Sequence, residues 1–125
     1  MITETTWGHA GHQANFEWTV TTYGILLDHL NGGPTYSIPW RTFAQVLTQA
    51  RIMASTNGNQ IPAGVNQNNP APGSIGEWVD GQNLPISQGL LTPRHLSFIG
   101  PILGRMGLAA HALEGNAIVW QFTFP

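Results

Sequence analysis

Two histidines early in the sequence, His9 and His12, have the spacing of a metal-binding pair. Neutral imidazole nitrogens are common metal ligands, and an H-x2-H segment can place two of them on one ion. A zinc site needs a third or fourth ligand as well, for which Asp28 and His29 are the most plausible candidates. Because two ligands in a terminal segment bind weakly, we expect unliganded histidines, with neither a metal nor another cofactor.

Asp28 and His29 are also the candidate catalytic residues, since a carboxylate and an imidazole can support acid–base chemistry. On a helix, adjacent side chains point about 100° apart, so another element would have to complete the pair. The helix dipole gives His29 a purely structural reason to stand near a helix C-terminus. The sequence has no Gly-x-Ser-x-Gly motif and no phosphate loop with a lysine. A small histidine-dependent hydrolase or metal enzyme therefore stays as an alternative, and whether the chain is an enzyme is left open.

The chain has no lysine, so its cations are four arginines: Arg41, Arg51, Arg94 and Arg105. Arg41 and Arg94 fall in the first turns of predicted helices, where the helix dipole disfavours a cation. A cation at such a position needs a compensating interaction nearby, which can be an ion pair with Glu77 or Asp80, or an anionic ligand. The ion pair is the simpler explanation, and Arg41 and Arg94 are candidate ligand-binding residues.

Five tryptophans are a high number for 125 residues. Trp18, Trp40 and Trp120 fit apolar stripes of predicted elements, whereas Trp7 and Trp78 stand near glycines in loop-like segments. An exposed indole beside neutral amides can bind sugar-like ligands or partner proteins through flat apolar contact and hydrogen bonds. Trp7 and Trp78 are therefore the other candidate contact residues, with packing under a long loop as the equal alternative.

The composition argues against several classes of function. A net charge of −2 gives no field for nucleic acid, and the absence of cysteine removes disulfides and thiolate metal sites. The first residues lack a basic segment followed by an apolar one, and no apolar run approaches about 18 residues. We therefore expect a single cytoplasmic domain spanning residues 1–125 that binds neither nucleic acid nor a membrane.

The first predicted element is a helix over residues 15–30. Phe16, Val20, Tyr23 and Leu27 recur at helical spacing, and a Gly-Gly-Pro segment follows. The alternation of Phe16, Trp18 and Val20 with polar residues also fits a strand, which stays as the alternative for the first half.

The remaining elements follow from apolar spacing and turn residues. Ser37 and Pro39 start a helix that ends near Ala54, and residues 60–74 form a mobile loop rich in proline and amides. Asp80-Gly81 predicts a short hairpin over residues 77–84. A helix over residues 92–106, kinked or divided at Pro101, precedes a hairpin over residues 109–124.

This order of elements predicts an α+β fold, with about three helices packed on a small antiparallel sheet that includes the C-terminal hairpin. Residues 92–124 resemble a winged helix at the level of pattern only, which makes a nucleic-acid binder using Arg94 and Arg105 a second alternative. The leading hypothesis is a non-enzymatic binding or assembly module. It would recognise a protein partner, a second copy of itself or a small neutral ligand through Trp7, Trp78 and the loop over residues 60–74.

Overall fold

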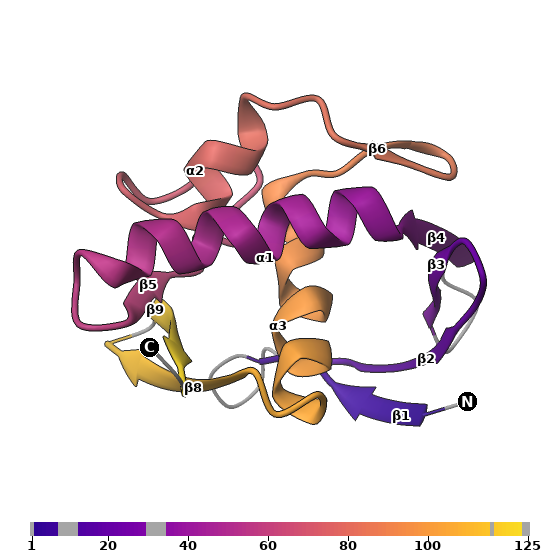
Figure 1. The fold of residues 1–125 in the computed structure, drawn as a ribbon, viewed down its shortest axis with the longest axis horizontal. Coiled ribbons are helices and arrows are strands. Elements are labelled where there is room, and N and C mark those ends of the chain that lie inside the picture. Colours follow the sequence, from indigo (N-terminus) through magenta and orange to yellow (C-terminus); the bar gives the residue numbers. More distant parts are fainter. Residues whose placement is uncertain (1, 8–12, 30–34, 116, 124–125) are drawn as a thin grey trace.

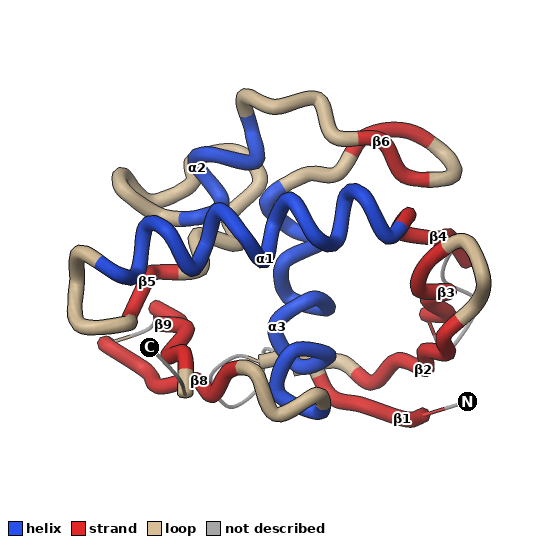
Figure 2. Tube along the Cα trace, viewed as in Figure 1, coloured by secondary structure: helices blue, strands red, loops and turns tan. Residues whose placement is uncertain are grey.

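The structure is a computed structural model that describes residues 2–7, 13–29, 35–115 and 117–123, with all of their side chains except that of His29. Three α-helices and three small antiparallel sheets make up these parts of the chain, which confirms the predicted α+β class (Figure 1). The three helices are α1 (Trp40–Ser55), α2 (Ile75–Asp80) and α3 (Leu96–Arg105). Helix α3 crosses the molecule below α1, with one sheet on each side of it (Figure 2).

The first sheet is formed by the strands β1 (Ile2–Thr5), β2 (Asn15–Val20), β3 (Gly24–His29) and β4 (Thr35–Pro39), in that order. The predicted helix over residues 15–30 is therefore wrong, because β2 and β3 form a hairpin there. Trp18 lies opposite Leu27 in this hairpin, and both side chains are buried on one face of the sheet. The alternation of β-branched and aromatic residues, which favours a strand, outweighs the coincident helical spacing.

The turn of this hairpin was the missing signal. The Thr21 hydroxyl accepts hydrogen bonds from the backbone N–H groups of Tyr23 and Gly24, at 3.2 and 3.1 Å. Gly24 also allows a close approach of β3 to β4, since a Cβ at this position would lie 2.0 Å from the carbonyl oxygen of Ile38. A threonine followed three residues later by glycine thus reverses the chain where we expected a continuous helix.

Helix α1 confirms the second predicted helix. Its buried residues lie on one face, whose middle is formed by Phe43, Val46 and Ala50. The helix contacts β3 and β4 at one end and the second sheet at the other. Ser37 is not its cap as predicted, because Ser37 lies in β4 and exchanges hydrogen bonds with Ser87.

Helix α2 replaces the hairpin predicted over residues 77–84. The Ser74 hydroxyl accepts the N–H of Glu77 at 3.1 Å, and the Glu77 carboxylate accepts the N–H of Gly73 at 3.1 Å. This is close to a capping box, for which the Ser-x-x-Glu spacing is the sequence signal. Gly81 has a φ of −96°, so the type I′ turn predicted at Asp80-Gly81 does not form.

The second sheet contains β5 (Gln60–Pro62), β9 (Ala117–Phe122) and β8 (Ala109–Glu114), with β9 in the centre. The β8–β9 pair confirms the predicted C-terminal hairpin. The strand β5 corrects the expectation that residues 60–74 carry no ladder, since Pro62 is tolerated as the last residue of an edge strand. A third sheet consists of β6 (Pro85–Ile86) and β7 (Gly89–Leu90).

Helix α3 follows a short 3-10 turn, η1 (Pro93–His95), and contacts β1 and β8. It continues through Pro101, so the predicted division into two helices does not occur there. Six of its ten residues are buried, which leaves little of it to enter a DNA groove as a recognition helix would. None of the helices in the described residues is both long and apolar enough to cross a membrane.

Candidate functional site

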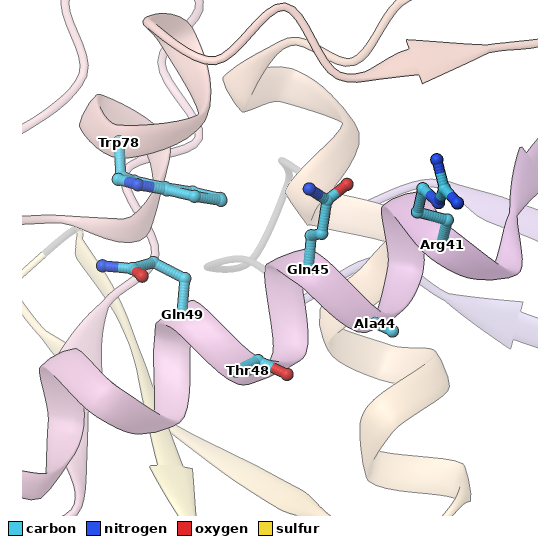
Figure 3. A pocket seen from close by; sticks show the side chains of 6 residues that line it. All are labelled: Arg41, Ala44, Gln45, Thr48, Gln49 and Trp78. Carbon is cyan, nitrogen blue, oxygen red and sulfur yellow. The ribbon is translucent and has the colours of Figure 1, made fainter.

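Arg41 and Trp78, two of the predicted contact residues, line the same pocket between α1 and α2 (Figure 3). The pocket has a volume of about 500 Å³. We call it the Trp78 groove, and its lining residues are Arg41, Ala44, Gln45, Thr48, Gln49 and Trp78. The structure thus brings together one predicted indole and one predicted guanidinium from different helices.

The floor of the Trp78 groove is one stripe of α1. Arg41, Gln45 and Gln49 are four residues apart and therefore lie one above the next on a helix. The buried stripe of α1 belongs to other positions, so these side chains are exposed or half-buried. We did not identify Gln45 and Gln49 from the sequence. The repeated i, i+4 spacing from Arg41 to two amides was the signal that could have revealed them.

Helix α2 holds Trp78 over this stripe. The N–H of Gly76 donates to the Ala63 carbonyl oxygen at 2.8 Å, which joins α2 to the segment after β5. A Cβ at Gly76 would lie 1.8 Å from the carbonyl oxygen of Gly64, so the backbones touch at this point. Trp78 is half-buried as a result. Its indole lies above Gln49 and extends toward Gln45 in Figure 3.

The charge of Arg41 has no ion-pair partner among the described residues. In the parts of the chain that the structure describes, the one ion pair within 4 Å joins Arg105 to Glu4. The predicted pairing of Arg41 with Glu77 or Asp80 is thus not found there, and Glu77 bonds to the backbone of Gly73 instead. The first turn of α1 contains no acidic residue either. The guanidinium is available to a ligand as a donor of several hydrogen bonds.

The side chains of the Trp78 groove are of types that can stack and form hydrogen bonds. The indole offers a flat apolar face, while the amides of Gln45 and Gln49 can each donate and accept hydrogen bonds. Arg41 is the one charged side chain among the described lining residues. The groove therefore presents neither a nucleophile with a base nor a general acid–base pair.

Arg94 lines a different pocket, together with Tyr36, Thr92 and His95. This second pocket has a volume of about 440 Å³ and lies beside β4 and the start of α3. Arg94 has no carboxylate within 4 Å among the described residues, so the simpler ion-pair explanation is not found for it either. Tyr36 and His95 come from segments far apart in the sequence, and no sequence pattern predicts that they line one pocket.

Trp7 packs inside the fold. Its ring stacks on that of His111, with 4.4 Å between the ring centroids and 23° between the planes. Its other contacts are with α3, where a Cβ at Gly100 or Gly104 would lie 2.8 or 2.7 Å from the indole. These contacts favour the packing alternative for Trp7, and Trp7 does not line the Trp78 groove.

The histidine candidates do not form a described site. His9 and His12 lie outside the described residues, as does the side chain of His29. Asp28 is half-buried on β3 and accepts a hydrogen bond from the Thr35 hydroxyl at 3.3 Å. Within the described parts of the chain, no three His, Cys, Asp or Glu side chains gather as metal ligands would.

Comparison of the chain with protein-family models, with curated proteins and with solved structures finds no match. Its function has to be argued from the groove that the structure forms.

Proposed function

We propose that this chain is a non-enzymatic binding module that holds a small neutral ligand bearing hydroxyl groups in the Trp78 groove. The observation that carries the proposal is the convergence of the Trp78 indole, two glutamine amides and the Arg41 guanidinium on one pocket. These residue types come from two helices that are each fixed by packing elsewhere in the fold.

A saccharide has the chemistry that this groove complements. One face of a sugar ring is apolar and can lie on the Trp78 indole, while the hydroxyls at its edge can bond to Gln45 and Gln49. The volume of about 500 Å³ falls within the range of small-molecule pockets. Arg41 contributes donors to hydroxyl oxygens without requiring a charged partner.

Titration with neutral trisaccharides tests the proposal. Maltotriose, cellotriose and chitotriose are suitable probes, and the NMR signal of the Trp78 indole N–H reports contact at this side chain. We expect one of them to shift that signal saturably. The variant Trp78→Ala is expected to weaken binding by about tenfold or more, since an aromatic anchor is commonly worth more than 1 kcal/mol.

Further variants distinguish the loss of a direct contact with the ligand from a general loss of structure. Trp78→Tyr keeps a flat aromatic face and is expected to retain part of the affinity. Gln45→Ala removes an amide from the groove, whereas Gln82→Ala removes an exposed amide just after α2 and is expected to bind as the unaltered protein does. Absence of binding by all three saccharides, or equal loss in Gln45→Ala and Gln82→Ala, would overturn the proposal.

Self-association is the second candidate function, and a different observation favours it. Tyr23 and Val20, at the turn between β2 and β3, expose 84% and 58% of their surfaces. The low charge of the chain adds little repulsion between copies. Light scattering over a concentration series is expected to show species larger than a monomer, fewer of which form in a Tyr23→Ser variant. A monomer at every concentration would contradict this candidate.

A further inference from the structure

The second pocket gathers titratable side chains that the sequence keeps apart. We call it the Tyr36 pocket, and its lining residues are Ala14, Tyr36, Gln67, Thr92, Arg94, His95 and Phe98. The ring of His95 meets that of Tyr36 edge to face, with 5.1 Å between the centroids and 81° between the planes. Phe98 makes the same kind of contact with the buried Phe16. The aromatic walls are therefore held by the core.

Hydrogen bonds determine which ring nitrogen of His95 carries the proton in the neutral imidazole. Its Nδ1 accepts the backbone N–H of Thr92 at 2.8 Å and lies 3.1 Å from the Thr92 hydroxyl oxygen. A nitrogen that accepts a hydrogen bond carries no proton, so the proton of the neutral ring is on Nε2.

Tyr36 keeps its proton as well. The side chain is 5% exposed, and this burial raises the pKa of its phenol, an effect that the positive charge of Arg94 partly opposes. The hydroxyl therefore remains an O–H group throughout the neutral pH range. Arg94, by contrast, is exposed at the side of the pocket and is paired with no carboxylate in the described residues.

We propose that the Tyr36 pocket binds a small organic acid, with its carboxylate on Arg94 and its apolar body against Phe98. A guanidinium matches a carboxylate with two parallel N–H donors, and the described lining residues include no acidic side chain that would compete for it. Thr92 and Gln67 can add neutral hydrogen bonds. The volume of about 440 Å³ leaves room for a ring or a short aliphatic chain beside the carboxylate. This site shares no residue with the Trp78 groove, so the inference stands apart from the proposed function.

Benzoate and hexanoate at millimolar concentration are the probes that test this site. Backbone amide NMR signals locate the binding, and we expect saturable shifts at Thr92, His95 and Phe98. Benzamide has the shape of benzoate without its charge, and we expect it to bind at least roughly tenfold more weakly, because a hydrogen bond to a charged group is stronger than one to a neutral group.

Variants and a bare anion complete the test. Arg94→Gln is expected to weaken benzoate binding by roughly tenfold or more. Arg51→Gln removes an equal charge from outside the pocket and is expected to leave the affinity for benzoate unchanged. Because Arg94 is exposed, its variant is expected to keep the native NMR spectrum apart from the pocket. Three outcomes would overturn the proposal: no saturable shift with either acid, benzamide binding as well as benzoate, or inorganic phosphate displacing benzoate at equal concentration.

Discussion

The Trp78 groove and the Tyr36 pocket differ in how far their side chains belong to the core. Gln45 and Arg41 in the groove project from the exposed face of a helix, and their loss removes little that the fold depends on. Tyr36 in the pocket is buried, and its ring meets that of His95. Substitutions in the lining of the groove are therefore expected to cost little stability, whereas those at Tyr36 are expected to cost more.

The two sites also differ in the aromatic side chain that accompanies their arginine. Arg41, on α1, lines the same pocket as the Trp78 indole, and Arg94 lines the same pocket as the buried phenol of Tyr36. Neither has an ion pair in the described residues. A cation in the first turn of a helix is unfavourable, so Arg41 lowers the stability of the protein that carries it.

Truncation of the two aromatic residues is expected to give the largest contrast. Tyr36→Ala is expected to lower the free energy of unfolding by about 3–5 kcal/mol, because a large buried ring leaves a cavity. Trp78→Ala is expected to lower it by about 1–2 kcal/mol, since the half-buried indole leaves water access to its site. Urea denaturation of both variants gives the two values. Equal losses would remove the distinction between the sites.

The second prediction concerns the position of α2, on which the Trp78 groove depends. Gly76→Ala is expected to lower the free energy of unfolding by about 2–3 kcal/mol, because the added Cβ meets the backbone of Gly64. Gly81→Ala adds a methyl group at the end of the same helix, where the nearest atom is 3.9 Å away, and is expected to change stability by less than about 1 kcal/mol. A Gly76→Ala variant as stable as Gly81→Ala would mean that α2 moves without cost.

Arg41 gives a smaller effect of opposite sign. Arg41→Gln is expected to raise the free energy of unfolding by about 0.3–1 kcal/mol at low salt, because it removes from the first turn of α1 a cation that has no ion pair in the described parts of the chain. Arg105→Gln breaks the ion pair with Glu4 and is expected not to stabilise the protein. Thermal unfolding at low and high salt compares the two variants. Destabilisation by Arg41→Gln would indicate a partner for Arg41 within the fold.

The smallest effect is a pH dependence that arises outside both sites. Burial lowers the pKa of His111, which stacks on Trp7, below its usual value. As the pH falls, the imidazole of His111 is therefore protonated in the unfolded chain before it is protonated in the folded one. Stability is lost as the pH falls through the unfolded pKa of about 6.5 toward the lower pKa of the folded state. We expect the free energy of unfolding to differ less between pH 7.5 and pH 5.5 in the His111→Gln variant than in the unaltered protein. Identical differences would assign the pH dependence to other groups.

Local signals in the sequence were sufficient for α1 and for the C-terminal hairpin. The apolar spacing of α1 and the turn between β8 and β9 each point to one structure. Residues 15–30 carried two patterns at once, because Phe16 and Val20 fit both a helix and a strand. Only the packing of β2 between β1 and β3 decides between them, and this packing is not a local property.

The candidate site was predicted in part. Arg41 and Trp78 were selected for separate reasons, one for its helix position and one for its surroundings, and the fold places them on one groove. Gln45 and Gln49 drew no attention because an exposed glutamine on a helix is ordinary. Tyr36 and His95 were missed because their pocket depends on β4 lying beside η1, which no spacing in the sequence encodes.

The central place of β9 in the second sheet bears on how the nascent chain folds. The strands of the first sheet pair with their neighbours in the sequence, so that sheet can form as soon as residue 39 has left the ribosome. Strand β5 has to wait for β9, since Ile61 pairs with Trp120. Until then the far end of α1 has no sheet to cover its apolar face. During translation the chain is therefore expected to expose this helix face until β9 has been made, and such exposed apolar surface favours aggregation.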